Sequence, residues 1–326
     1  MSLYAIGIDV GGTRVRGGLV SNEGHILARR AVATRHDAGP EGVIHQIVEM
    51  AQQLMDEASL PVAGVGVAVP GAVNPYTGVV RFAPNLPGWH DLPVRSLLAS
   101  HVQSSVFLGN DANLAAVAEH RFGAGRGYHH LIYITVSTGI GGGIIVDNRL
   151  LLGHHGYAAE IGHHTVKEDG PRCKCGNIGC LEALASGTAI AREARVAVAT
   201  GVPTRLRDLC AGDIWRLNAA HVVQAANAGD EVAKRILEQA GHYLGVGILN
   251  LLHMFNPQRV ILGGGVMQAG EWITRPMWAV LHQRLHSGYL ENCDIVLAAL
   301  GDNVGILGAA ALVFQERGGT PWTSAS

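Results

Sequence analysis

Residues 3–20 read LYAIGIDVGGTRVRGGLV, two apolar runs joined by a glycine turn that follows Asp9. Short apolar runs on both sides of a glycine pair are typical of two β-strands joined by a tight turn. The stretch 131–146, LIYITVSTGIGGGIIV, repeats this arrangement later in the chain. The sequence therefore predicts one strand–turn–strand unit used twice.

The segments around these two units alternate between strand and helix patterns. Residues 62–73 (VAGVGVAVPGAV) are typical of a buried strand, whereas residues 92–102 and 112–122 have the i, i+3, i+4 apolar spacing of helices. After residue 182 the pattern is mainly helical, interrupted by a predicted strand at 259–266 and closed by a predicted helix at 304–317. Strands that alternate with helices indicate an α/β architecture.

Length and composition limit the kind of protein. A chain of 326 residues exceeds the size at which a single core stops growing, so two domains are expected. Lys and Arg total 24 against 26 Asp and Glu, which leaves no basic surplus for a nucleic acid partner. No apolar stretch reaches the roughly 18–20 residues of a membrane span, and the N-terminus has no secretion signal. We expect a cytoplasmic protein without disulfides, although it has five cysteines.

Glycine is unusually frequent, at 44 of 326 residues, and gathers directly after apolar runs. Such turns let backbone N–H groups approach the phosphates of ATP closely. Neither a P-loop nor a G-x-G-x-x-G that opens a helix is present, and each cluster taken alone could simply close a hairpin. Asp9 at a strand end is suited to Mg²⁺, directly or through water. The candidate ATP and Mg²⁺ residues are Asp9, Gly11, Gly12, Thr13, Arg14, Thr138, Gly139, Gly141, Gly264 and Gly265.

Asp111 is the candidate for the chemistry. The segment Asn110–Asn113 (NDAN) follows the apolar run 104–109 and precedes a predicted helix, so Asp111 is expected at the C-terminal end of a strand. Functional side chains of open α/β sheets concentrate at that edge. An aspartate here could instead be a helix N-cap, and the two roles can coexist.

Three cysteines lie close together at positions 173, 175 and 180, ten residues after His163. Three thiolates and an imidazole match the tetrahedral preference of Zn²⁺ for sulfur and nitrogen ligands. Buried structural cysteines are the alternative interpretation, and the residues alone do not choose between His163 and His164. Four protein ligands would leave no open position, so such a zinc would be structural. Cys210 and Cys293 stand alone and are expected to be ordinary buried thiols.

Five motifs in this order carry a family resemblance: DVGGTRVRGG from residue 9, NDAN from 110, STGIGGG from 137, EIGHH from 160 and CKCGNIGC from 173. Together they resemble the ROK family of bacterial sugar kinases and sugar-responsive repressors, over nearly the whole chain. The resemblance implies an actin-like or hexokinase-like fold of two ribonuclease-H-type domains, with ATP and sugar in an interdomain cleft. It implies a small domain of residues 1–115 plus 302–326, a large domain of residues 116–301 with the zinc loop and dimerisation helices, and a homodimer or homotetramer.

The resemblance also implies roles for individual residues. Asp111 would be the general base for the 6-hydroxyl of the sugar, and Asn110 would bind the neighbouring hydroxyl. The family's E-x-G-H motif selects His163 as the metal ligand beside Cys173, Cys175 and Cys180, so that zinc would orient the imidazole toward the sugar. The implied sugar-binding residues are Gly71, Asn85, Asn110, Asp111, Glu160, His163 and Glu182.

The identity of the sugar is the last expectation. Residues 83–93 (APNLPGWHDLP) resemble the glucokinase members, which favours glucose, while 110–190 also resemble the N-acetylmannosamine kinases. N-acetylmannosamine or N-acetylglucosamine is therefore the alternative substrate, and polyphosphate stays open as a second phosphoryl donor. The family's repressors carry a helix-turn-helix domain before the first glycine motif, where this sequence has eight residues. A sensor without catalysis is not favoured, because Asp9, Asp111 and the glycine clusters are intact.

Overall fold

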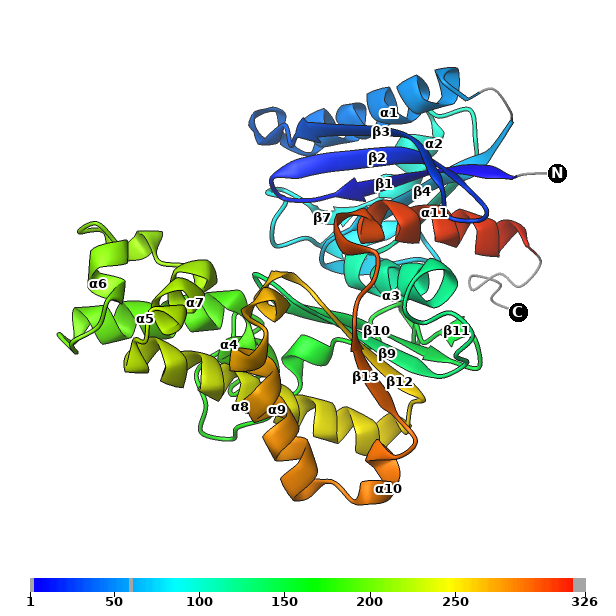
Figure 1. The fold of residues 1–326 in the computed structure, drawn as a ribbon. Coiled ribbons are helices and arrows are strands. Elements are labelled where there is room, and N and C mark those ends of the chain that lie inside the picture. The colour runs from blue at the N-terminus through cyan, green and yellow to red at the C-terminus, as the bar shows by residue number, and fades with distance from the viewer. Residues whose placement is uncertain (1–2, 59–60, 319–326) are drawn as a thin grey trace. The chain divides into compact units, whose positions relative to one another are not determined.

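A computed structural model describes residues 3–58 and 61–318 (Figure 1). By its contacts the chain forms two compact units, one of Met1–Tyr133, Gly143–Ala159 and Ala298–Ser326, the other of Ile134–Gly142 and Glu160–Leu297. These units divide the chain at other points than the predicted domains, 1–115 plus 302–326 and 116–301, and those limits stay a prediction. Within the described ranges, no helix combines the length and the apolar character needed to cross a membrane.

The first unit is built on a five-stranded sheet with the order β3-β2-β1-β4-β8. β1 pairs antiparallel with β2 and parallel with β4, and β8 extends the parallel part. The strands predicted within 3–20 and 62–73 are confirmed. The strand bounds are β1 (Tyr4–Val10), β2 (Arg14–Ser21), β3 (Ile26–Ala33), β4 (Val62–Val69) and β8 (Val106–Asn110).

Helices cover both faces of this sheet. Alternate residues of a strand point to opposite faces, and in β1 Ile6 and Ile8 belong to the cluster that contains the apolar side chains of α1 (Gly39–Asp56), while Ala5 packs with α11 (Val304–Arg317). Figure 1 shows α1 and α11 on the two sides of the sheet. The sheet is thus the middle layer of the first unit.

Two glycines let α11 lie directly on the sheet. A Cβ at Gly7 would fall 2.0 Å from the carbonyl oxygen of Ile306, and one at Gly66 only 1.8 Å from that of Ala309. Any larger residue would push the helix backbone away, because real Cβ atoms do not approach so closely. The contact of α11 with β1 and β4 therefore depends on these glycines.

α3 (Asp111–Phe122) packs beside α11 and carries the buried carboxylate of Glu119. Its Oε2 accepts from the N–H of Ala124 at 2.8 Å, and its Oε1 accepts from the N–H groups of Ala299 and Leu300 at 3.0 and 2.9 Å. One side chain thus joins α3 to the segment that leads into α11. The unit also contains η1 (His36–Ala38), β5 (Ala72–Asn74), β6 (Val79–Phe82), β7 (His90–Leu92), α2 (Val94–Ala99), β11 (Arg149–Leu150) and η5 (Gly301–Asn303).

The second five-stranded sheet has the order β11-β10-β9-β12-β13. β9 (Leu131–Val136) and β10 (Ile140–Val146) are the second strand–turn–strand unit that the sequence predicted, and the boundary of the compact units passes through them. β12 (Arg259–Gly263) runs parallel to β13 (Asp294–Leu297). The predicted strand at 259–266 is confirmed over its first five residues.

The second unit is mainly helical after residue 182, as predicted. α8 (Glu231–Phe255) packs against α9 (Glu271–Arg284), where a Cβ at Gly241 would lie 2.4 Å from the Ile273 carbonyl oxygen. Asp230 caps the start of α8 by accepting from the N–H of Ala233 at 2.8 Å. The remaining elements are η2 (Ile161–His163), α4 (Leu181–Ala185), α5 (Gly187–Ala199), α6 (Leu206–Leu209), η3 (Ile214–Arg216), α7 (Ala219–Asn227), η4 (Gly265–Ala269) and α10 (Ser287–Leu290).

Candidate active site and metal centre

Asp9 is a buried carboxylate at the end of β1, one residue before the first glycine turn. Burial raises the pKa of this carboxyl, while the charge of Arg16 and its hydrogen bonds act in the opposite direction. Arg16 donates from Nη2 to Oδ2 at 2.6 Å. The pair is mostly withdrawn from water, so its charges are weakly screened.

The glycine turn after Asp9 is held by hydrogen bonds from residues 34 and 36. The N–H of Gly11 donates to the Arg14 carbonyl at 2.9 Å, which closes the turn. The Thr34 hydroxyl donates to the Gly11 carbonyl at 2.7 Å, and the His36 imidazole contacts the Gly12 carbonyl. Thr13 and Arg14 lie exposed at the tip of this turn.

Two of the predicted site residues of the first unit meet at Gly12. A Cβ on Gly12 would lie 2.9 Å from the carbonyl oxygen of Asn85, so a glycine is needed for the turn to sit against that residue. Asn85 itself is exposed. A candidate phosphate-binding turn and a candidate sugar-binding residue are therefore neighbours.

Asp111 begins α3 directly after β8, as the sequence predicted. The N-cap of this helix is Asn110, whose side chain accepts from the N–H of Asn113 at 3.0 Å. The Asn110 amide group also donates to the carbonyl of Gly71 at 2.9 Å, which brings two more of the predicted sugar residues together. Asp111 accepts from the N–H of Ala112 at 2.8 Å, within its own helix turn. The capping role considered for Asp111 thus belongs to Asn110.

The second glycine turn, at residues 137–139, gathers other predicted residues of the second unit. Oε2 of Glu182 accepts from the N–H of Ile140 at 2.9 Å, beside Gly139. Gly264, at φ +90°, abuts Val136, because a Cβ there would lie 2.3 Å from that carbonyl oxygen. Two of the three glycine clusters therefore lie against each other. Gly141 lies within β10, and Gly265 opens η4 with free space around it.

His163, Cys173, Cys175 and Cys180 place four ligand atoms within 4.8 Å of one another. Sγ of Cys175 and Sγ of Cys180 are 3.7 Å apart, and Sγ of Cys173 lies 3.7 Å from Nδ1 of His163. Ligands of tetrahedral zinc with Zn–S bonds of about 2.3 Å lie about 3.8 Å apart, so the donor set fits this ion. The group could therefore hold a metal.

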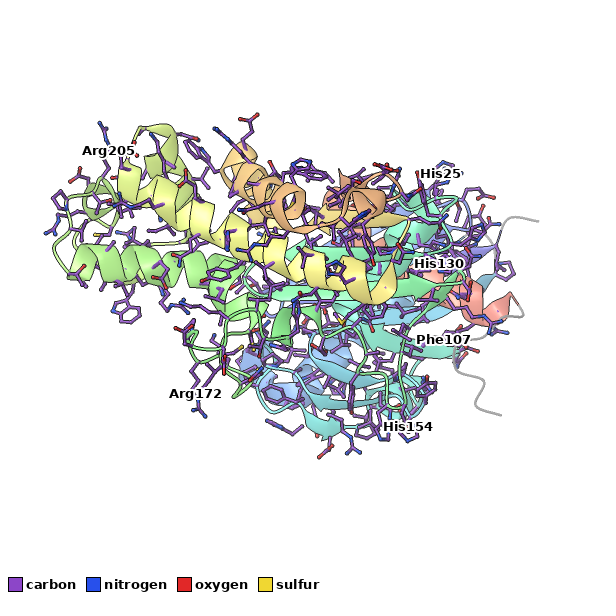
Figure 2. The ribbon with its side chains drawn as sticks, turned by 90° about the horizontal axis from the view of Figure 1, so that it is seen from below. His25, Phe107, His130, His154, Arg172 and Arg205 are labelled. Atoms are coloured by element: carbon purple, nitrogen blue, oxygen red, sulfur yellow. The ribbon has the colours of Figure 1, made fainter. Side chains whose placement is uncertain are left out.

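The loop that carries these cysteines is folded on itself. Its backbone bridges join Arg172 to Ile178 and Thr165 to Cys180. Arg172, next to the first cysteine, lies on the exposed edge of the loop (Figure 2). Gly179 has φ +66° and leaves no room for a Cβ against the Lys167 carbonyl. The cysteines are thus held by a compact turn rather than by a long helix or strand.

The thiols differ in acidity because their surroundings differ. Burial, together with the neighbouring Cys175 and Cys173, raises the pKa of Cys180 to about 12. For Cys175 burial acts in the same direction, but hydrogen bonds from the Asn177 N–H and from Cys173 and Cys180 outweigh it and lower the pKa. Metal binding at this group would therefore release protons.

The two adjacent histidines have different roles in the fold. Nδ1 of His163 faces Cys173, while its Nε2 lies 3.9 Å from Oε2 of Glu160. His164 instead contacts the Ile161 carbonyl through Nδ1 at 2.6 Å. Desolvation raises the pKa of Glu160, an effect that His163 opposes and Glu182 reinforces, and the 51% exposure of its side chain limits the change. His163 is thus the histidine of the metal group.

Some contacts at these turns were absent from the sequence prediction. Arg16 pairs with Asp9, and Thr188 donates its hydroxyl to the Thr138 carbonyl at 2.9 Å. Arg16 could have been found by counting the hairpin register from the glycine turn, which sets it opposite Asp9. Thr188 has no local signal, because its partner is 50 positions earlier in the chain.

Two α/β units, whose sheets each contain a strand–glycine turn–strand unit, define a protein of the actin and hexokinase fold class with ribonuclease-H-like domains. The ROK family model matches residues 5–316. The chain belongs to the ROK family.

Relatives within this family include kinases and repressors. The chain is 38% identical to a glucokinase of Thermotoga maritima, over 97% of this chain and 99% of the relative. It is 32% identical to the xylose repressor of Bacillus subtilis, over 96% of this chain and 77% of the repressor. A ROK family glucokinase from Streptomyces griseus, solved in complex with glucose and AMPPNP, matches with a TM-score of 0.80 and 34% identity, over 96% of this chain and 99% of that chain.

Proposed function

We propose that this protein is an ATP-dependent hexose kinase that phosphorylates the 6-hydroxyl of glucose. The observation that carries the proposal is the position of Asp111 at the start of α3. Its neighbour Asn110 donates a hydrogen bond to the carbonyl of Gly71. The similarity to glucokinases at up to 38% identity supports the same activity. The relative solved with glucose and AMPPNP supports a sugar and a nucleoside triphosphate as substrates.

In the proposed reaction Asp111 accepts the proton of the sugar 6-hydroxyl as its oxygen attacks the γ-phosphorus. The bond between that phosphorus and the β,γ-bridging oxygen breaks, and its electron pair leaves with ADP. Such a transfer needs positioning and charge neutralisation more than covalent help from the protein. Asp111 accepts a hydrogen bond from the Ala112 N–H, which limits the rotation of its carboxylate.

The donor side would use the glycine turns. Backbone N–H groups of Gly12 and Thr13 in the first turn, and of Thr138 and Gly139 in the second, suit the phosphates of ATP, while the N–H of Gly11 closes its own turn on the Arg14 carbonyl. Asp9 would hold the accompanying Mg²⁺ through its water shell. The hydrogen bonds from Thr34 and Thr188 to carbonyls of these turns fix the turns without occupying their N–H groups.

The acceptor residues we propose are the polar side chains that the family resemblance implies, together with the backbone of Gly71. In the first unit we assign Gly71, Asn85 and Asn110 to the sugar, and in the second Glu160, His163 and Glu182. Zinc held by His163, Cys173, Cys175 and Cys180 would fix the imidazole through Nδ1. The Nε2 atom, near Glu160, would then be free to bond a sugar hydroxyl.

The first experiment measures ADP release with Mg²⁺ and ATP against glucose, mannose, N-acetylglucosamine and N-acetylmannosamine. We expect the highest kcat/KM with glucose. A preference for an N-acetylated sugar would replace glucose by that substrate, and polyphosphate in place of ATP tests the second donor. If no sugar is phosphorylated but one binds, the protein is a sugar sensor and the kinase proposal is wrong.

The second experiment tests the base. Asp111→Asn keeps the size and polarity of the side chain but cannot accept the proton, so we expect kcat to fall by about 10²–10⁴ with sugar affinity retained. Asp56→Asn, the same change at an exposed residue at the end of α1, is the control. An Asp111→Asn variant that keeps half of the wild-type kcat would exclude this base.

We also propose a homodimer or homotetramer. α8 and α9 present a groove lined by charged and apolar side chains, including Arg235, Trp272 and Arg275, which offers a surface for such a contact. Light scattering of the purified protein measures the mass directly, and a monomer at micromolar concentration would contradict this part of the proposal.

A further inference from the structure

Arg16 lies directly opposite Asp9 in the antiparallel pair of β1 and β2. Its Nε and Nη2 both donate to Oδ2 of that carboxylate, at 3.1 and 2.6 Å. Within residues 3–58 and 61–318, the hydrogen bonds to the Asp9 side chain all end on this one oxygen. Oδ1 of Asp9 is thus the oxygen that the guanidinium leaves for a further ligand.

The third nitrogen of the same guanidinium reaches another segment. Nη1 of Arg16 donates to the carbonyl of Asp302 at 3.2 Å, in the short turn η5 that leads into α11. The first turn of α11 closes over Asp9, because a Cβ on Gly305 would lie 2.5 Å from Cγ of Asp9. One guanidinium therefore connects β1, β2 and the start of α11 around a single carboxylate.

The chemistry of arginine suits this position better than that of lysine. A guanidinium is planar and always charged, and its fork of donors can reach a carboxylate and a carbonyl at once, whereas an ammonium is a point charge on a flexible stem. The positive end of the α11 dipole adds to the compensation of the buried carboxylate. The net charge of the Arg16–Asp9 ion pair is also close to zero. The pair therefore repels an approaching triphosphate far less than an unpaired carboxylate would.

We propose that Arg16 is a positioning residue for the phosphoryl donor, which holds Oδ2 of Asp9 so that Oδ1 is presented to the hydrated Mg²⁺ of Mg·ATP. This inference rests on the proposed function, since it takes Asp9 as the magnesium-side acid. Arg16 acts through Asp9 and is not itself assigned a contact with the phosphates. Replacement of Arg16 should therefore weaken the binding of the nucleotide and leave the affinity for sugar unchanged.

The test uses Arg16→Lys and Arg16→Ala, with Arg30→Ala as the matched control. Arg30 lies in the next strand of the same sheet, opposite Gly17, and pairs with the exposed Glu57. Calorimetry on the sugar-free protein gives the Kd for Mg·ADP, and steady-state rates give KM for Mg·ATP and for glucose. Loss of a charge-assisted hydrogen bond predicts a Kd and a KM for the nucleotide about tenfold or more above wild type. The KM for glucose stays within about twofold, and Arg30→Ala resembles wild type in all three constants.

A double-mutant cycle separates positioning from direct contact. In an Asp9→Asn background, replacement of Arg16 should no longer weaken Mg·ADP binding, because the residue through which it acts has lost its charge. If the Arg16 effect persists in that background, Arg16 touches the nucleotide itself and the proposal is wrong. Should Arg16→Ala fail to fold, Arg16→Lys, which keeps the charge, carries both measurements.

Two outcomes distinguish this inference from the proposed function. If wild type binds Mg·ADP but phosphorylates no sugar, the kinase proposal fails while the binding data still test Arg16. If Arg16→Lys and Arg16→Ala bind Mg·ADP as wild type does and only lower the melting temperature, Arg16 is a structural ion pair and the inference is overturned. A wild type that does not bind Mg·ADP refutes both.

Discussion

Glu119→Gln should destabilise the first unit strongly although it removes only one charge. The side chain has no exposed surface, and its two oxygens accept three backbone N–H groups, those of Ala124, Ala299 and Leu300. Ala124 follows α3, whereas Ala299 and Leu300 precede α11 and lie 180 and 181 positions after Glu119 in the chain. The carboxylate therefore closes a large loop of the chain through a single buried group.

The magnitude follows from counting acceptors. Glutamine can turn its one carbonyl oxygen toward Ala299 and Leu300, but its NH₂ group then faces the N–H of Ala124, donor against donor. The NH₂ group of the buried glutamine, which faces a donor instead of an acceptor, costs about 1–3 kcal/mol, and the bonds from Ala299 and Leu300 lose their charge assistance. We expect a loss of about 2–4 kcal/mol in the free energy of unfolding of this unit. Glu119→Ala, which removes all the acceptors, should cost more.

Amide hydrogen exchange is the suitable assay, because a chain of two units need not unfold in a single step. Peptides that contain residues 124 and 299–300 should lose protection in Glu119→Gln, and urea unfolding of the first unit should shift to lower concentration. Glu57→Gln, at an exposed carboxylate at the end of α1, is the control. Unchanged exchange in both peptides, with an unfolding free energy within about 0.5 kcal/mol of wild type, would refute the reasoning.

Three further expectations concern other parts of the fold. Cys175→Ser, or removal of metal by a chelator, should lower both the melting temperature and the affinity for sugar; a freshly purified, metal-replete protein with less than about 0.2 zinc per chain would contradict a structural site. Burial alone would raise the pKa of Asp230, but hydrogen bonds from the N–H groups of Ala233 and Arg205 and from the Thr204 hydroxyl hold it below the usual value of an aspartate. Its charge therefore adds stability at neutral pH that disappears on acidification through the lowered pKa, so the stability gap between wild type and Asp230→Asn should narrow toward low pH in urea unfolding; a constant gap would contradict this. Gly66→Ala should destabilise the first unit by about 3 kcal/mol or more, because the added Cβ would meet the α11 backbone. Gly64→Ala, where the atom nearest to an added Cβ is 3.0 Å away, should cost less. Equal effects of the two variants on the urea midpoint would be evidence against the direct contact of α11 with the sheet.

Local patterns predicted the strands and the glycine turns because their signals lie within a few residues. The glycine after Asp9 and the apolar runs on both sides determine a hairpin without help from the rest of the chain. The position of Asp111 at a strand end followed from the same kind of evidence. Its neighbour Asn110 caps the helix, a distinction that the sequence did not make because both residues favour that position.

Contacts between distant segments could not be predicted from the sequence. Gly12 meets Asn85, and Glu119 binds Ala299 and Leu300, yet nothing near these residues in the sequence identifies their partners. The metal group is intermediate. The spacing of Cys173, Cys175 and Cys180 indicated a site, but the residues alone did not choose between His163 and His164; the family motif selected His163, and the ring orientations agree with that choice. The catalytic and binding roles of these residues stay predictions.

The contact of α11 with the first sheet has a consequence for synthesis of the chain on the ribosome. α11 is made after every other element described here, yet it covers β1 and β4, which are made among the first. At about 5–20 residues per second, the face of the sheet that includes Ala5 and Val20 waits roughly 15–60 s for its cover. During that time the nascent chain presents an apolar surface that chaperones can bind. A chain terminated before residue 304 would leave this face open permanently, so late truncations should be cleared by proteolysis.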